Sequence, residues 1–152
     1  QEYAELEQLH NSGMSPIKYS DLTGSIKGRS NIISRMRELL ETAQKEIVIC
    51  TSASDFEDKS RVIVPTIEKL VSKNVKVRIA LSGDEEHVKK LNAKHSLKAR
   101  TTDSTARMCI SDKKEILFMV TPENSKEEVA VWLNSPFFIE SLYNLFDQNQ
   151  RK

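Results

Sequence analysis

Two short apolar runs, at residues 47–50 and 75–81, constrain the fold of this chain more than any other feature. The first run, Ile-Val-Ile-Cys, is apolar throughout, and the second has valine, isoleucine or leucine at every other position. Such runs are typical of strands in the interior of a sheet. Apolar residues at helical spacing precede each run, over residues 32–43 and 64–71. The order helix, strand, helix, strand predicts an α/β fold with a parallel strand pair joined by a crossover.

The second half of the chain has short strands joined by polar turns. Residues 106–111 and 115–120 are predicted strands on either side of the turn Asp112-Lys113-Lys114, and residues 129–133 form a further strand. Ser135-Pro136 then provides an N-cap and a first helical position. The helix that follows is predicted to bury four apolar side chains, Phe138, Leu142, Leu145 and Phe146. The predicted sheet is therefore mixed and flanked by helices.

Three weaker elements complete the prediction. A short strand is expected over residues 21–26, in an otherwise irregular segment. A charged helix is expected from Asp84 to about Ala93, and residues 95–100 are expected to form an edge strand.

The first thirteen residues predict a helix separate from the rest of the chain. Tyr3, Leu6 and Leu9 form one narrow apolar stripe, and the Asn-Ser-Gly sequence at residues 11–13 ends the helix. A helix this short is marginal in water on its own, so we expect it to pack on the domain or on its copy in a dimer. The expected organisation is thus a dimerisation helix over residues 1–13 and one domain over residues 14–152.

Composition narrows the class of protein. The chain has 152 residues, a net charge of +1 and two cysteines, which suits one ordinary domain without a disulfide framework. It contains no apolar run long enough to span a membrane and no visible signal peptide, so we expect a cytoplasmic protein. Basic side chains outnumber acidic ones over residues 59–100. That flank suits a polyanion, but most such runs are solvated helix faces, which is the interpretation we favour.

The sequence lacks the motifs of metal binding, of nucleotide hydrolysis and of serine-esterase chemistry. The three histidines have no zinc-site spacing, and Cys50 and Cys109 are expected to be buried free thiols. The four glycines form no phosphate-binding loop, and no G-x-S-x-G motif is present. We therefore expect no metal and no cofactor.

The predicted hairpin resembles one half of the phospholipase D fold. Active members carry H-x-K-x4-D at this place, with the histidine as the nucleophile that accepts the phosphoryl group. The matching residues are Thr105, Arg107 and Asp112. A threonine hydroxyl is a poor nucleophile without an adjacent base, so the resemblance implies a phospholipase-D-like mixed sheet without catalysis. Read without the family, Asp112 is a suitable turn residue and Arg107 a partner for a carboxylate.

A second resemblance covers about residues 20–149 and is carried by the helix over 32–43, the strand that follows it, and Val131-Trp132-Leu133-Asn134-Ser135-Pro136-Phe137-Phe138. In these features the chain resembles the TrmB family of archaeal transcription regulators. Members pair a winged-helix DNA-binding domain with a catalytically dead phospholipase-D-like effector domain through a dimerising helix. The resemblance therefore implies a homodimer that reaches DNA through an N-terminal domain absent from this chain. Sugar-sensing members carry a further β-rich extension, which is also absent here.

We place the candidate effector site beyond the carboxyl ends of the parallel strands, where open α/β sheets leave a crevice. Its predicted ligand is a sugar or a phosphorylated metabolite. Ser54 and Ser82 are more simply explained as turn or capping residues, and Trp132 as a core residue. The candidate ligand-binding residues are Thr51, Ser52, Asp84, Thr105, Arg107 and Asn134.

Two other classes of function stay open at this stage. One is a phosphodiesterase or nuclease that uses the basic flank and a nucleophile not identified here. The other is a structural dimerisation module without a ligand. An effector-sensing domain that shifts the population of a DNA-binding dimer is the function we favour.

Overall fold

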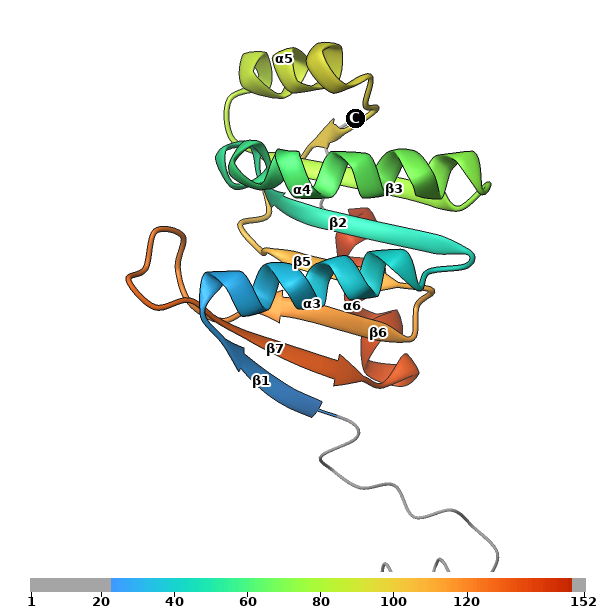
Figure 1. Cartoon of the computed structure of the whole chain (residues 1–152), viewed down its shortest axis with the longest axis vertical. Helices are drawn as coiled ribbons and strands as arrows, with labels where there is room; N and C mark the ends of the chain where they lie inside the picture. Colours follow the sequence, from blue (N-terminus) through green and yellow to red (C-terminus); the bar gives the residue numbers. More distant parts are fainter. Residues whose placement is uncertain (1–22, 149–152) are drawn as a thin grey trace, which may run out of the picture.

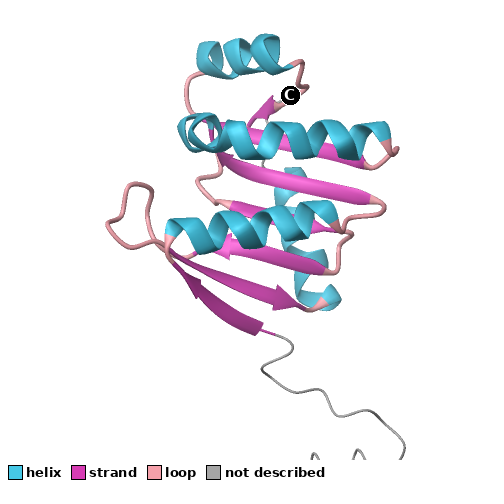
Figure 2. Ribbon diagram, viewed as in Figure 1, coloured by secondary structure: helices cyan, strands magenta, loops and turns pink. Residues whose placement is uncertain are grey.

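A computed structural model describes residues 23–148 as a seven-stranded mixed sheet with helices on both faces (Figures 1 and 2). The strand order is β1-β7-β6-β5-β2-β3-β4. In chain order the elements are β1 (Thr23–Lys27), α3 (Arg29–Glu41), β2 (Glu46–Ser52), α4 (Ala53–Ser72), β3 (Lys76–Ser82), α5 (Glu85–His95), β4 (Arg100–Thr101), β5 (Met108–Ser111), β6 (Glu115–Met119), β7 (Val129–Asn134) and α6 (Pro136–Gln148). The predicted helix over residues 1–13 lies outside the described residues.

The parallel half of the sheet follows the predicted crossover. β2 and β3 pair in parallel from Glu46↔Lys76 to Ser52↔Ser82, and α4 connects them. One face of the sheet packs against α3 and α4, in a core that includes Ile32, Phe56 and Leu81. The prediction of a mixed α/β sheet with this parallel pair is confirmed.

The antiparallel half is a meander from β5 to β7, with β1 added at its outer edge. The predicted turn after β5 is confirmed, with Asp112 and Lys113 in the left-handed region at φ 54° and 57°. The Asp112 carboxylate accepts hydrogen bonds from the backbone N–H groups of Gln44, Lys45 and Glu46, at 2.8–3.0 Å. Asp112 therefore fixes the start of β2 as well as the hairpin, which supports its interpretation as a structural residue.

The second face of the sheet is covered by α6, which lies behind the sheet in the view of Figure 1. Ile139 is fully buried there, against Val48 and Ile110. Phe138 was expected to be buried but is 41% exposed, because Ile139 takes the inward position. Leu142 is partly buried as predicted, whereas the side chains of residues 145 and 146 lie outside what the structure describes.

Two element boundaries differ from the prediction. α4 begins at Ala53 rather than near residue 64, because Ser52 caps it by accepting the Asp55 N–H at 3.0 Å. The edge strand β4 has two residues rather than the predicted segment 95–100. α5 continues to His95, and Asn92 then holds the next residues away from the sheet.

Candidate functional site

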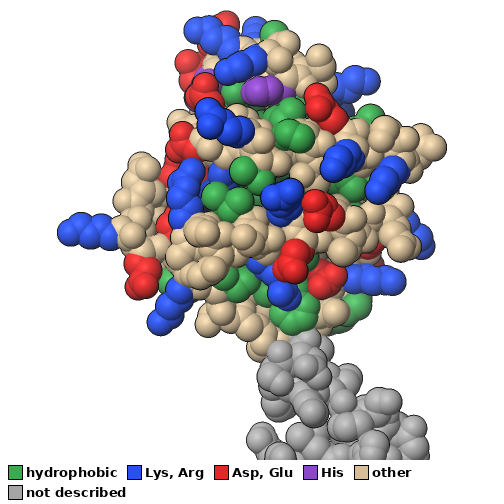
Figure 3. Space-filling view, in the orientation of Figure 1, with side chains coloured by type: hydrophobic (Ala, Val, Ile, Leu, Met, Phe, Trp, Pro, Cys, Tyr) green, Lys and Arg blue, Asp and Glu red, His purple; other side chains and the backbone are tan. Residues whose placement is uncertain are grey.

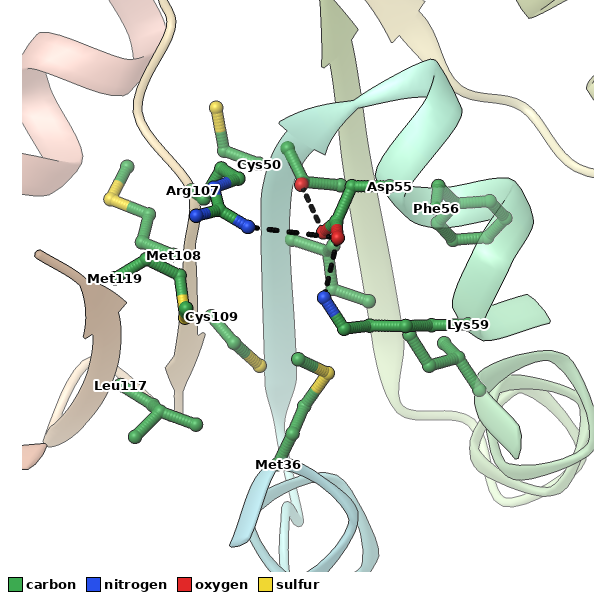
Figure 4. Close-up of a pocket in the computed structure, with 13 residues that line it drawn as sticks. Met36, Cys50, Asp55, Phe56, Lys59, Arg107, Met108, Cys109, Leu117 and Met119 are labelled. Carbon is green, nitrogen blue, oxygen red and sulfur yellow. Dashed lines mark hydrogen bonds and ion pairs between the residues drawn. The ribbon is translucent and has the colours of Figure 1, made fainter. Parts of the chain in front are cut away.

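Five polar residues meet at the carboxyl end of β2, on the face that carries α3 and α4. Thr51 ends the buried part of β2, and Asp55 and Lys59 follow on the first turns of α4. Arg107 precedes β5, whose antiparallel register with β2 brings Met108 opposite Cys50. Glu128 precedes β7 at the same edge of the sheet. Figure 4 shows Arg107 and Lys59 pointing toward the Asp55 carboxylate from two different directions.

Asp55 is the centre of this cluster. Its carboxylate contacts Lys59 Nζ at 2.5 Å and accepts a hydrogen bond from Thr51 Oγ1 at 2.7 Å. Arg107 Nη1 lies 3.6 Å from Asp55 Oδ1. Asp55 and Lys59 are one helical turn apart, the spacing at which side chains on a helix meet.

Arg107 is bound on its other sides as well. Its Nη1 lies 3.3 Å from Glu128 Oε2, and its Nη2 donates to the Thr121 carbonyl oxygen at 2.7 Å. The cluster thus contains two cations, Lys59 and Arg107, and two anions, Asp55 and Glu128. All four residues are buried. A buried charge must be paired, and here the pairing is internal.

The pKa of Asp55 reflects these contacts. Burial raises the pKa of the carboxyl, but hydrogen bonds from Lys59 and Thr51 and the charges of Lys59 and Arg107 outweigh burial, so the net pKa is lowered. Asp55 is therefore a stable anion at neutral pH. It holds the positive charge of Arg107 in place and leaves little of it for an external ligand.

The cavity beside the cluster is small. Its volume is about 20 Å³, which is the space for roughly one water molecule. Met36, Met108 and Met119 line it together with Asp55, Lys59 and Arg107, as Figure 4 shows. A small-molecule site generally has about 300–1,000 Å³. A sugar or a phosphorylated metabolite does not fit here in this arrangement.

The two cysteines that line this cavity are unreactive at neutral pH. Burial raises the pKa of Cys50 to about 11, although a Ser104 hydrogen bond opposes the shift, and burial raises the pKa of Cys109 to about 12. Thiols with such values are protonated at neutral pH and are poor nucleophiles. Both are free and buried, as the sequence predicts.

The predicted site residues divide into several groups. Thr51 and Arg107 belong to the cluster. Ser52 and Asp84 are helix caps, since their side chains accept the N–H groups of Asp55 and Glu86 at 3.0 and 3.2 Å. Thr105 lies exposed in the loop before β5.

Asn134 lies at the opposite end of the strands from Thr105 and Arg107. It pairs with Glu115 at the start of β6, whereas Met119, at the end of β6, pairs with Ala130 near Glu128. The full length of a strand therefore separates Asn134 from the cluster. The prediction that Asn134 joins Thr105 and Arg107 at one site is not supported by this register.

Sequence reasoning missed Asp55 and Glu128, and it counted Lys59 with the solvated basic flank. Lys59 is instead 3% exposed. The spacing of Asp55 and Lys59 was the one available signal, but it is also typical of an exposed helical pair. Glu128 had no signal, because only the register of β6 and β7 brings it to Arg107.

Neither histidine of the described part supplies the missing base to this site. His87 lies on α5 and contacts Glu57 Oε1 at 2.8 Å, and His95 ends the same helix. Within residues 23–148, no group of three or more His, Cys, Asp or Glu side chains is placed to hold a metal ion. In the same range, no helix is both long and apolar enough to cross a bilayer.

Comparison with known proteins adds a family and a fold. Residues 24–152 match the family model described as transcriptional regulator TrmB, EBD N-terminal subdomain. No curated protein matches the sequence. Among solved structures, TrmBL2, described as an archaeal chromatin protein with a novel mode of DNA binding, is similar at a TM-score of 0.64 and 19% identity. The alignment covers 97% of this chain and 58% of TrmBL2, so the chain spans little more than half of that protein.

Two further solved structures share the fold. Nuc from Salmonella typhimurium, a phospholipase D family member, has a TM-score of 0.63 and 15% identity, over 85% of this chain and 95% of its own. NucT from Helicobacter pylori has a TM-score of 0.63 and 12% identity, over 84% and 95%. At such identities the likeness concerns the fold alone, and it confirms the predicted phospholipase-D-like sheet.

Proposed function

The chain belongs to the TrmB family of transcriptional regulators, and from this premise we propose that it is the non-catalytic, effector-sensing and dimerising part of a longer cytoplasmic regulator. DNA would be bound by an N-terminal domain of the parent protein. The DNA binding described for TrmBL2, of which this chain spans only part, supports that assignment.

One observation carries the non-catalytic part of the proposal. The position that holds a histidine in active phospholipase-D-like enzymes is Thr105, and the cation two residues later, Arg107, is tied to Asp55, Glu128 and the Thr121 carbonyl. Enzymatic cleavage of a phosphodiester requires a nucleophile and, at the same site, a cation that is available to stabilise the phosphoryl group. Here the first is replaced and the second is already neutralised inside a cavity of about 20 Å³.

The mechanism we propose is a population shift. An effector that binds one arrangement of the dimer more tightly shifts the equilibrium toward that arrangement. The size of this shift cannot exceed the difference between its binding free energies for the two arrangements. Half-site spacing on DNA follows dimer geometry, so a small rotation changes operator affinity. We place the coupling in residues 3–9 of the predicted helix over residues 1–13, which would join this domain to the DNA-binding part.

The direct test is a phosphodiesterase assay of the chain with bis(p-nitrophenyl) phosphate, with and without divalent metal, and with a catalytically active phosphodiesterase as the positive control. We expect no turnover above the buffer rate. Turnover that is abolished by Thr105→Ala would contradict the proposal and favour the enzyme class.

The sensing function needs a second test. Thermal unfolding against a panel of sugars and their phosphates detects a ligand, because a ligand at about 100 times its dissociation constant stabilises by about 2.7 kcal/mol. The operator affinity of the parent protein is then measured with and without each positive compound. A panel without any stabilising compound would favour a purely structural dimerisation domain.

A further inference from the structure

A second cationic region lies at the outer edge of the parallel half, away from the buried cluster. β4 pairs only with Ala80 and Leu81 of β3, and Figure 1 shows it as a short arrow beside that strand. Among the described residues, the stretch of β3 from Lys76 to Ile79 therefore has no strand neighbour on this side. The chain segment 96–99 runs toward β4 without joining the sheet.

Asn92 explains why this edge stays open. Its side-chain amide donates to the Ala99 carbonyl at 3.0 Å and accepts the Ala99 N–H at 2.9 Å. The backbone carbonyl of Asn92 also accepts a hydrogen bond from the Leu97 N–H, at 3.0 Å. Ser96 begins the segment in the left-handed region, at φ 56°. These bonds direct the Leu97 N–H and both backbone groups of Ala99 toward α5, so the segment does not continue β4 along β3.

The result is a groove of about 410 Å³ between β3 and the segment that leads into β4. Its volume falls within the usual range for small-molecule sites, about 300–1,000 Å³. The residues that line it are Lys76, Val77, Arg78, Ile79, Lys98 and Arg100. Four of these six carry positive charge, and none is acidic.

The cations come from both walls of the groove. Lys76 and Arg78 belong to β3, whereas Lys98 and Arg100 come from the opposite wall. Arg78 is positioned by the Tyr143 hydroxyl on α6 and by Glu46, whose Oε2 lies 4.0 Å from Arg78 Nη1. Glu46 thus offsets part of the charge of Arg78, and the groove lining itself contains four cationic residues and no acidic one. On the face that carries α3 and α4, by contrast, basic and acidic side chains are interspersed (Figure 3).

We infer that this edge groove binds the phosphate group of a small phosphorylated metabolite, and that such a metabolite is the effector. The inference rests on the proposed sensing function and names its site and ligand class. Charge-assisted hydrogen bonds from lysine and arginine are the usual way in which proteins hold a phosphate. A compact ligand suits the geometry better than a nucleic acid, because the four cations converge on one groove instead of following a line of phosphates.

The experiment is calorimetric titration of the 152-residue chain with inorganic pyrophosphate, and with sugar phosphates paired with their free sugars. We expect the phosphates to bind and the free sugars to bind at least about tenfold more weakly. The double variant Lys98→Gln, Arg100→Gln should weaken pyrophosphate binding by about tenfold or more, the size of one lost charge-assisted contact. Both residues are exposed, so the variant is expected to fold.

A matched control removes the same charge elsewhere. Lys89→Gln, Lys90→Gln changes two exposed lysines of α5 that do not line the groove, and it should alter pyrophosphate affinity by no more than about twofold. Amide chemical shifts should move at residues 76–79 and 97–100 when pyrophosphate is added. Equal weakening by both double variants, or unchanged affinity in the groove variant, would overturn the inference.

The remaining outcomes separate this inference from the proposed function. If free sugars bind and phosphates do not, the groove assignment is wrong while effector sensing stands. If phosphates bind in the groove without changing the operator affinity of the parent protein, the groove site stands and the sensing function fails. If duplex DNA displaces pyrophosphate and also depends on Lys98 and Arg100, the groove belongs to nucleic acid and the small-ligand inference is overturned.

Discussion

The buried cluster and the edge groove each bring several cations together, but only one of them has charge available for a ligand. In the cluster, Lys59 and Arg107 are matched by Asp55 and Glu128 in a cavity of about 20 Å³. In the groove, four cations line about 410 Å³ without a lining carboxylate. The comparison teaches that a residue type at a family position does not define a binding site. The neighbours that neutralise the residue, and the space left beside it, decide whether it binds anything.

Burial is the physical reason for the difference. Moving a charge out of water costs several kcal/mol, so cations inside the protein are found with anions. Lysine and arginine at an edge keep their charged ends in water while their aliphatic stems cover apolar surface, so they need no partner. The exposed groove cations Lys76, Lys98 and Arg100 can therefore exchange water for a phosphate, next to an Arg78 that Tyr143 and Glu46 hold in position.

The largest effect is expected when the cluster loses its central anion. Asp55→Asn keeps the shape of the side chain but leaves Lys59 and Arg107 with Glu128 as their one remaining carboxylate in the cluster. We expect the free energy of unfolding to fall by about 3–5 kcal/mol, as for other broken buried ion pairs. Urea denaturation measures this directly.

The controls for that substitution use exposed residues. Asp58→Asn removes a carboxylate three residues later on α4, at an exposed position, and should change stability by no more than about 0.5 kcal/mol. The groove variant Lys98→Gln, Arg100→Gln should also stay within about 0.5 kcal/mol. Equal losses for Asp55→Asn and Asp58→Asn would show that the cluster is not a tightly coupled buried network.

A smaller effect is expected on the pH dependence of stability in acid. Burial raises the pKa values of Asp55 and Asp112, but hydrogen bonds and positive charges outweigh burial and lower both. A carboxyl whose pKa is lowered by folding stabilises fully above its unfolded pKa, about 4, and loses that contribution as the pH falls through its folded pKa. Stability should therefore decrease steeply below about pH 4.

Asp112→Asn tests the share of one carboxylate in this acid dependence. Asparagine tolerates the left-handed backbone at residue 112, but its single neutral acceptor oxygen cannot serve all three N–H groups, and its NH2 group takes the place of the other carboxylate oxygen. We expect a loss of about 1–2 kcal/mol at neutral pH, as for other capping carboxylates, and a shallower loss of stability in acid. An unchanged acid slope, measured by urea titration at several pH values, would contradict this role of Asp112.

Much of the fold follows from the sequence because apolar periodicity reports burial. The runs at 47–50 and 75–81 are β2 and β3, and the polar turn at residues 112–114 is the hairpin between β5 and β6. The first half of α4 was missed because its buried face carries Asp55 and Lys59, which break the apolar pattern. Pro65, a residue favoured in first turns, also lies inside this helix.

The candidate site is less accessible to sequence reasoning because it depends on register. The resemblance to phospholipase D located Thr105 and Arg107, and Thr51 followed from its place after a predicted strand. The sequence could not show that Glu128 lies against Arg107, since these residues are brought together by two strand pairings, β5 with β6 and β6 with β7. Nor could it show the groove, which depends on Asn92 diverting residues 97–99 from the sheet.

Apart from the control variants, the smallest expected loss of stability is at Asn92, the residue that keeps the groove open. Asn92→Ala removes the two amide contacts to Ala99 without changing any charge, so we expect a loss of only about 1 kcal/mol. Pyrophosphate affinity should nevertheless fall, because the segment that carries Lys98 is no longer held apart from β3. Unchanged affinity in a folded Asn92→Ala variant would show that the opening of this edge does not depend on Asn92.

The most direct measurement is a crystal structure of the chain soaked with tungstate, an anomalous scatterer that stands in for phosphate. The account predicts an anomalous peak in the groove between β3 and residues 98–100, in contact with Arg78, Lys98 or Arg100, and no peak at Arg107. A tungstate ion bound beside Thr105 and Arg107, with Arg107 turned away from Asp55, would contradict it.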